Sequence, residues 1–314
     1  MDRTTVIRFL VGIAIVSALI YLNNPSKTFS MILTASPRYL ALAAVFYPVM
    51  MLIYTFRWKF ILSQMGEHLP MPMAFQAITG GALLSDFTPG KLGQFAKPYM
   101  ISEKINFHRG LASVIIDHYA DALTATILGI TGLLVVPHKW NLYLILGVIV
   151  LLGGLFAISL LWLKRGPILK LVEMSKNRQL IDTAESLYDS IECIQNTPKL
   201  LAIAISIGLV IWVPNALRIF LITRSLGYTA PVYMIFFLLP LVALFSVLPV
   251  TIAGLGLTET GMALMMVMLG LPIPLGISVA LLDRAISVTG DLVFGGRYVL
   301  RLLKARKRQR SEGK

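Results

Sequence analysis

Long apolar runs recur along the whole chain, and they constrain its fold more than any other feature of the sequence. Runs of roughly 20 residues have the length that an α-helix needs to cross the bilayer core, which is about 30 Å thick. Hydrophobic residues make up 57% of the 314 residues and charged residues 14%, whereas a soluble domain carries about 25% charged residues. The sequence therefore predicts an all-α, polytopic membrane protein. Six runs are expected to span the membrane: Val6–Leu22, Tyr39–Trp58, Leu111–Val136, Asn141–Leu163, Leu200–Ile222 and Leu275–Leu300.

Two further apolar stretches are too short or too interrupted to be simple spans. The first, Met73–Ser85, is followed by the turn-rich sequence TPGKLGQ. The second, Pro231–Val250, contains Pro240 and Pro249 and precedes TIAGLGLTETG and a short apolar run, Met262–Leu271. Short segments interrupted by Gly and Pro are typical of broken helices that line a site. We therefore expect six full spans and two re-entrant elements, with eight spans as the alternative.

The distribution of basic residues predicts the orientation. The chain has 28 Lys and Arg against 15 Asp and Glu, a formal net charge of +13. In a membrane protein such an excess is read first as cytoplasmic loops and contact with anionic lipid, and not as a nucleic-acid surface. Six spans with both termini in the cytoplasm place all the basic clusters on one side. Residues 64–109 then enter the membrane from the cytoplasm, and residues 227–274 enter from the opposite side.

The chain is expected to form a single integral membrane domain over residues 1–314. Its parts are a first half (1–163), a cytoplasmic amphipathic connector (164–199), a second half (200–300) and a basic tail (301–314). The two halves have similar sequence patterns. LLSDFTPGKLGQ precedes IIDHYADAL in the first half, and LFSVLPVTIAGLGLTE precedes LLDRAISVTGDL in the second. The two broken elements also have opposite orientations. Together these features favour an inverted repeat.

Charged residues inside the predicted spans are candidates for function. Asp117, His118 and Asp121 lie in the third span, and Asp283 and Arg284 lie in the last. A charge near the bilayer centre costs about 2.5–3.5 kcal/mol, so each one needs a partner or a wet cavity. Two interpretations stay open: a structural ion pair of Arg284 with Asp283 or Asp117, and a translocation path. His118 is either a proton relay between carboxylates or a singly capped histidine.

Two arginines lie near or inside other spans. Arg57 is close to the inner end of the second span and is expected to reach lipid phosphate by snorkelling. Arg218 lies within the fifth span after Pro214 and is a candidate for the path, with the outer interface as the alternative.

The Gly-rich turns are candidate anion sites. In the first turn Thr88 is expected to cap a helix whose first residue is Pro89, with Lys91 and Lys97 adding positive charge. The N-terminus of a helix attracts anions through its free N–H groups and its dipole. A tight turn that binds no ligand is the alternative.

The second turn has the same character. Gly254 and Gly256 lie in it, Thr258 is the expected cap, and Glu259 follows in the first helical turn. The sequence lacks a Walker A element, an HExxH motif and a GxSxG motif, and Cys193 is its single cysteine. We therefore expect no cofactor, no metal site and no enzymatic activity.

The arrangement resembles one family, the flippase-like transmembrane region of lysylphosphatidylglycerol synthases (multiple peptide resistance factors) and its stand-alone relatives. The family's Pro-x-Arg-x-Gly-Glu-x-x-Arg element is similar to Pro89, Lys91, Gly93, Gln94 and Lys97, with Lys in place of Arg and Gln in place of Glu. These replacements keep the positive charges and remove the acidic residue.

Two other elements extend the resemblance. The family's Pro-Gly-Gly-x-Gly-x-x-Glu element is similar to Ala253, Gly254, Gly256 and Glu259. Its charged motifs in the third and last full spans are similar to Asp117, His118, Asp121 and Arg284.

The resemblance implies movement of an anionic phospholipid or polyprenyl-phosphate lipid across the cell membrane without ATP. The chain ends at Lys314, so the aminoacyl-transferase domain of complete synthases is expected to be absent. Two alternatives stay open: a proton-coupled transporter of a small anion, and a non-catalytic subunit that docks a glycosyl- or aminoacyl-transferase through residues 164–199. A homodimer is also possible. The residues predicted to bind or move the substrate are Lys91, Gly93, Gln94, Lys97, Asp117, His118, Asp121, Arg218, Gly254, Gly256, Glu259, Asp283 and Arg284.

Overall fold

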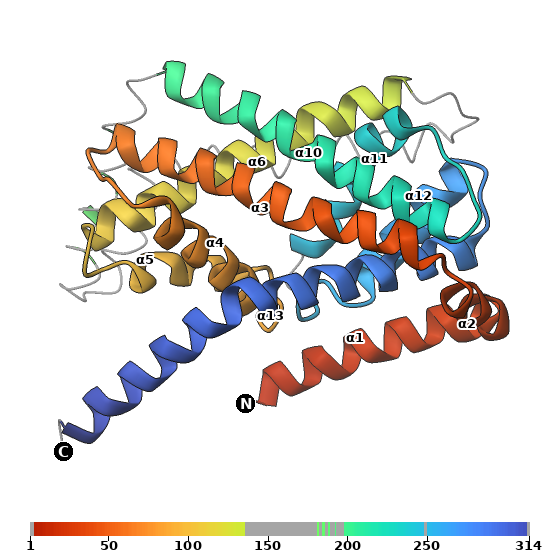
Figure 1. Cartoon of the computed structure of the whole chain (residues 1–314), viewed down its shortest axis with the longest axis horizontal. Coiled ribbons are helices and arrows are strands. Elements are labelled where there is room, and N and C mark those ends of the chain that lie inside the picture. The colour runs from red at the N-terminus through yellow and green to blue at the C-terminus, as the bar shows by residue number, and fades with distance from the viewer. Residues whose placement is uncertain are drawn as a thin grey trace.

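The computed structural model describes residues 3–135, 198–247 and 250–312, together with five residues of the connector: Ile181, Ala184, Glu185, Tyr188 and Glu192. Within these residues all the named elements are helices (Figure 1). The all-α class is therefore confirmed. The predicted span Asn141–Leu163 and most of the connector 164–199 lie outside the described residues.

Four described helices are long and apolar enough to cross a membrane: α1 (Arg3–Leu22), α3 (Pro37–Gln64), α6 (Phe107–Val135) and α10 (Pro198–Ser225). They confirm four of the predicted spans. The last predicted span lies within α13 (Ile273–Glu312), a helix of 40 residues that extends beyond the other helices toward the C-terminus (Figure 1). At 1.5 Å per residue α13 is about 60 Å long, which exceeds the thickness of a bilayer core.

The two interrupted stretches form short helices, as predicted. The first contains α4 (Met71–Ser85), the 3₁₀-helix η1 (Leu92–Ala96) and α5 (Lys97–Met100). The second contains α11 (Val232–Val247) and α12 (Leu257–Met268). With 15 and 16 residues, α4 and α11 rise only about 22–24 Å, less than the bilayer core. Figure 1 shows α4 and α5 at the end of the bundle where α3 ends and α6 begins, and α11 and α12 toward the opposite end.

One short helix was not predicted. The segment between the first two spans forms α2 (Pro25–Leu33), whose cap Asn24 accepts a hydrogen bond from the Lys27 N–H at 3.1 Å. An Asn followed by Pro at the first helical position is the usual signal for such a start. α2 packs on α13, where the Ser278 hydroxyl donates to the Thr28 carbonyl at 3.3 Å.

The helix packing follows the predicted inverted repeat. α3 and α10 have 28 residues each and pack on one another. α4 packs against α13 of the other half, and α11 packs against α6 in the same way. Each short helix thus packs against the equivalent long helix of the other half. A pseudo-two-fold axis between the two halves requires this arrangement.

Close contacts of the two halves also correspond. Gly93 lies against the backbone of Ser85, and Gly254 lies against Ser246, the same number of residues earlier in the chain. A Cβ atom at Gly93 would lie 2.2 Å from the Ser85 nitrogen, and one at Gly254 would lie 2.6 Å from the Ser246 Cα. Only glycine permits such approaches of one backbone to another, which is why each broken element needs its Gly-rich turn.

The two Gly-rich turns meet each other. Pro89 and Ile252 form an isolated antiparallel bridge, and the Ala253 N–H donates to the Thr88 carbonyl at 3.3 Å. Each turn follows the short helix that enters from its own end of the bundle. The tips of the two re-entrant elements are therefore joined inside the protein.

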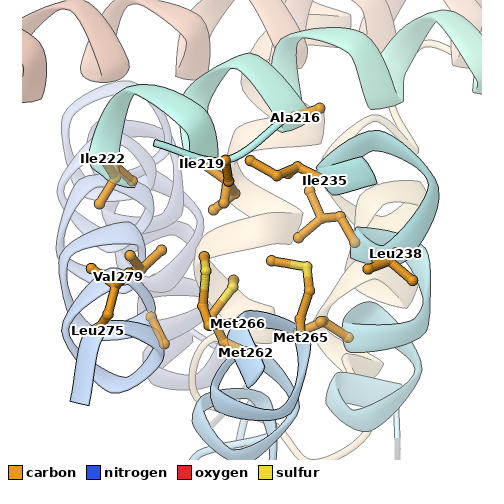
Figure 2. Close-up of a cluster of buried hydrophobic side chains, with 14 of the residues drawn as sticks. Ala216, Ile219, Ile222, Ile235, Leu238, Met262, Met265, Met266, Leu275 and Val279 are labelled. Carbon is orange, nitrogen blue, oxygen red and sulfur yellow. The ribbon is translucent and has the colours of Figure 1, made fainter. Parts of the chain in front are cut away.

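The second half has a core rich in methionine. Figure 2 shows Met262, Met265 and Met266 of α12 pointing toward apolar side chains of α10, α11 and α13. All three methionines are at most 2% exposed. Because methionine is flexible, it fills the irregular space left between helices of unequal length.

Adjacent glycines of α13 provide a test of the packing of α4 on α13. A Cβ atom at Gly295 would lie 2.5 Å from the Thr79 carbonyl oxygen, whereas one at Gly296 would meet only Leu83 Cδ2 at 4.0 Å. We expect Gly295→Ala to lower the free energy of unfolding by on the order of 1–3 kcal/mol through overpacking. Gly296→Ala should be neutral or slightly stabilising, because alanine favours the helix. Thermal unfolding of the detergent-solubilised variants measures both, and equal melting temperatures would contradict the packing.

Candidate functional site

A buried arginine joins α3 to α6. Arg57 has no exposed surface; its Nε donates to Asp117 Oδ1 at 2.8 Å and its Nη1 donates to Asp121 Oδ1 at 2.6 Å. The two aspartates are four residues apart and so share one face of α6. The expectation that Arg57 snorkels to lipid phosphate is wrong, because these carboxylates give the guanidinium a partner inside the protein.

Lys97 belongs to the same cluster. Its side chain is 2% exposed, and its Nζ lies 3.5 Å from Asp117 Oδ2 and 5.2 Å from the centre of the Trp58 ring. The sequence predicted Lys97 as a charge that helps to attract an anion. The structure instead gives Lys97 a carboxylate partner, so the four side chains Arg57, Lys97, Asp117 and Asp121 form a charge-balanced cluster.

His118 follows Asp117 on α6 and lies beside this cluster. Its Nδ1 is 2.9 Å from the Val114 carbonyl oxygen, and its ring stacks on Phe95 with centroids 5.4 Å apart. A helical carbonyl as the partner of Nδ1 is the contact that the capped-histidine interpretation predicts.

The second half repeats the arginine–aspartate pair. Arg218 Nε lies 2.9 Å from Asp283 Oδ1, and the Arg218 side chain is 7% exposed. Arg218 and Arg57 stand at the same position counted from the first residues of α10 and α3, as do Asp283 and Asp117 in α13 and α6. Arg218 therefore does not reach the outer interface, and the inverted repeat places equivalent ion pairs in its two halves.

The N-terminus of α12 is occupied by the protein's own carboxylate. Glu259 is fully buried; its Oε2 accepts from the Gly256 N–H at 2.7 Å and its Oε1 accepts from Arg284 Nε at 2.7 Å. The N-cap is Gly256 and not Thr258, whose hydroxyl donates to the Gly254 carbonyl. Arg284 pairs with Glu259 and not with an aspartate. Because Glu259 satisfies the helix end, this turn is not a free anion site.

The first turn also differs from its expected form. Lys91, and not Thr88, is the N-cap residue, and the helix begins at Leu92 because Pro89 pairs with Ile252 of the other turn. Thr88 still acts as an acceptor, since its hydroxyl receives the Gly93 N–H at 2.8 Å.

Gln94 follows this turn and supports it. A Cβ atom at Gly81 of α4 would lie 3.1 Å from Gln94 Oε1, so the amide lies against the α4 backbone. Gln94 thus packs the short helices together.

Lys91 is the cation of the site that no carboxylate neutralises directly. No carboxylate oxygen of the described residues lies within salt-bridge distance of its ammonium, and the residue is exposed. It nevertheless lies close enough to Asp86, Asp121, Arg284 and Asp291 for direct electrostatic interaction. Lys91 is therefore an accessible lysine that lies among charged groups from α4, α6 and α13.

The sequence analysis missed a third polar group beside Lys91. Tyr47 of α3 donates a hydrogen bond to buried Asp291 of α13, and Asp86 at the end of α4 lies beside Asp291. Tyr47 also packs against Gly290, where a Cβ atom would lie 2.5 Å from its ring. Asp291 could have been found from the sequence, because it lies two turns after Arg284 on the same predicted span. Tyr47 and Asp86 lie in no local pattern that predicts their contact with Asp291.

These groups define what the site can do. Across the described residues no three His, Cys, Asp or Glu side chains are placed to hold a metal ion. Arg57, Arg218 and Arg284 are each paired with an acid, whereas Lys91 is an accessible cation without such a pair among the described residues. An accessible lysine that no carboxylate neutralises is able to bind an anion reversibly.

The arginine cluster makes a prediction about stability. Arg57→Met leaves Asp117 and Asp121 without their main partner in a buried position, so we expect a loss of about 3–5 kcal/mol in the free energy of unfolding. Arg109→Met is the matched control, because Arg109 is half exposed in its pair with Glu67 and is expected to cost at most about 1 kcal/mol. Denaturant unfolding in mixed micelles measures the two losses. If they are equal, the buried cluster does not stabilise the fold.

The comparisons with known proteins agree with this architecture. Residues 9–295 match the family described as the lysylphosphatidylglycerol synthase TM region. A UPF0104 membrane protein of Methanocaldococcus jannaschii is 24% identical over 334 residues, which cover 100% of this chain and 98% of that protein. A second, of Pyrococcus horikoshii, is 24% identical over 324 residues, with 93% of this chain and 95% of the relative covered. A third, of Methanothermobacter thermautotrophicus, is 24% identical over 307 residues, with coverage of 89% and 88%. The chain is therefore a multi-pass membrane protein that belongs to the lysylphosphatidylglycerol synthase TM region family.

Proposed function

We propose that this protein moves an anionic lipid head group between the two leaflets of the cell membrane without ATP. The observation that carries the proposal is Lys91, an accessible cation at the junction of two re-entrant elements that enter from opposite ends. A phosphate is strongly disfavoured in the hydrocarbon core. A fixed positive charge at the middle of its route offsets part of that cost.

Partial exposure of other charged side chains supports a polar route past Lys91. The side chain of Asp121 is 37% exposed, that of Arg284 is 24% exposed and that of Asp283 is 21% exposed. These residues lie well inside α6 and α13, away from the helix ends. Charged groups that keep accessible surface at such depth point to a hydrated passage between the helices.

The paired residues have a different role in this proposal. Arg57 and Arg218 hold their acids, so they fix the walls of the passage and leave Lys91 to meet the substrate. Arg284 forms an ion pair with Glu259 and still has accessible surface. It is therefore the second residue that we expect to bind a phosphate. The acyl chains stay in the bilayer, so only the head group needs the polar passage.

The family is consistent with a lipid substrate, either a phospholipid or a polyprenyl phosphate. Its description, the lysylphosphatidylglycerol synthase TM region, names a phospholipid. We infer transport and not catalysis for this chain, because the described site offers charge and no nucleophile activated by a base.

Replacement of Lys91 tests the proposal. In liposomes with head-group-labelled phosphatidylglycerol, a membrane-impermeant reductant bleaches the inner-leaflet label only as the lipid crosses. Lys91→Gln removes one charge-assisted contact of about 1.5–3 kcal/mol, so we expect crossing to slow about 10- to 100-fold. Lys91→Arg should retain most of the rate.

Lys104→Gln is the control for this experiment, because Lys104 is an exposed lysine of the loop before α6. Its loss should leave the rate unchanged. If Lys91→Gln moves lipid as fast as Lys104→Gln, the proposed passage is wrong.

A proton-coupled transporter of a small anion is the second candidate. It is favoured by the group of Tyr47, Asp86 and Asp291, because two neighbouring carboxylates repel unless they share a proton. This candidate predicts uptake of a soluble anion that depends on a pH gradient and is lost in Asp291→Asn. Lipid crossing that is independent of the pH gradient would exclude it as the main activity.

A further inference from the structure

A pocket lies between α4 and α13, and none of the paired charged residues described above lines it. Its volume is about 290 Å³. The lining residues come from the start of α4 and from the second half of α13: Pro72, Phe75, Gln76, Val293, Phe294, Arg297 and Tyr298.

The depth of the pocket matches the boundary between acyl chains and head groups. α13 rises about 36 Å from Ile273 to Arg297, more than a hydrocarbon core of about 30 Å, so we expect Arg297 to reach the head groups near the end of the predicted last span. Pro72 lies in the first turn of α4, at the end from which this helix enters. In the orientation set by the basic residues, this is the cytoplasmic side.

The two ends of the pocket differ in chemistry. Arg297 is exposed, and none of the described carboxylates forms an ion pair with it. Gln76 is also exposed, and the Tyr298 hydroxyl donates to the Met100 carbonyl at 2.5 Å, which fixes its ring. No side chain caps the N-terminus of α4, so the positive end of that helix adds to the charge of Arg297.

The deeper end is apolar and open to the bilayer. Phe75 and Phe294 meet edge to face with their centroids 5.7 Å apart, and Val293 is 66% exposed. Phe294 also stacks on Tyr47 at 6.1 Å. The rings form a rigid wall along which an acyl chain can lie.

We propose that this pocket binds one anionic phospholipid of the cytoplasmic leaflet. The phosphate pairs with Arg297 and accepts from the Gln76 amide, while an acyl chain follows Val293 and Phe294 into the bilayer. A free phosphate ion would leave the apolar wall uncovered, so the occupant is a lipid. The proposal concerns binding alone and stands independently of the proposed translocation.

Native mass spectrometry of the purified protein tests this site. The protein in detergent is titrated with phosphatidylglycerol and, separately, with phosphatidylcholine, and the bound lipid is counted. Arg297→Gln should reduce phosphatidylglycerol binding about 10- to 100-fold, the range expected for loss of one charge-assisted hydrogen bond. Arg8→Gln is the matched control, since Arg8 lies near the cytoplasmic end of α1 and outside the pocket; it should change binding little.

A second variant fills the pocket without removing charge. Gln76→Trp places a large ring between α4 and α13 and should reduce binding of phosphatidylglycerol, whereas Gln76→Asn should retain it. Lys91→Gln should bind as the wild type does, so failure of the transport proposal leaves this test intact. Equal binding of both lipids by the wild type, or equal losses in Arg297→Gln and Arg8→Gln, would overturn the site.

Discussion

The cost of placing charge inside a membrane governs this structure. Each of the ionisable groups in the spans would be prohibitive alone, so each arginine of the interior is held by an acid from another helix. Arg57 ties α3 to α6, and Arg218 ties α10 to α13 at the equivalent positions. Because α3 and α10 also pack on one another, these pairs connect the long helices of both halves. The short helices α4, α11 and α12 pack against this framework of long helices, and they end between them.

Backbone geometry is the second requirement. A helix that ends inside the membrane exposes N–H and C=O groups, which need partners there. The two turns solve this together: Pro89 and Ile252 pair, Gly93 donates to Thr88, and Glu259 accepts from the start of α12. The close approach of the backbone at Gly93 requires glycine at this position. The glycine content of the turns and the pairing of the turns therefore depend on each other. The turns therefore keep backbone groups paired although the short helices end between the other helices.

Span length and Gly/Pro interruption are local properties, which is why the long helices and both broken elements were predictable from the sequence. The partners of the charges were not, because they depend on which helices pack together. Arg57 looked like a snorkelling residue by its distance from a helix end, and Glu259 looked available to a ligand until its contact with Arg284 was known. A usable signal was present in the repeat itself. Arg57 and Arg218 occupy matching positions before matching aspartates, and that coincidence already indicates two interior ion pairs.

The two halves of the repeat have equivalent helices, but the charged residues at their Gly-rich turns differ. This difference affects how many anions the two turns can bind. In the second half Glu259 fills the start of α12 and neutralises Arg284, so that turn presents no uncompensated cation. In the first half Lys97 is likewise neutralised by Asp117, but Lys91 extends from its turn without such a partner. Two joined turns thus present one accessible cation of their own. In the proposed function, a head group that enters from either leaflet would meet the same charge, so one position would serve both directions of movement.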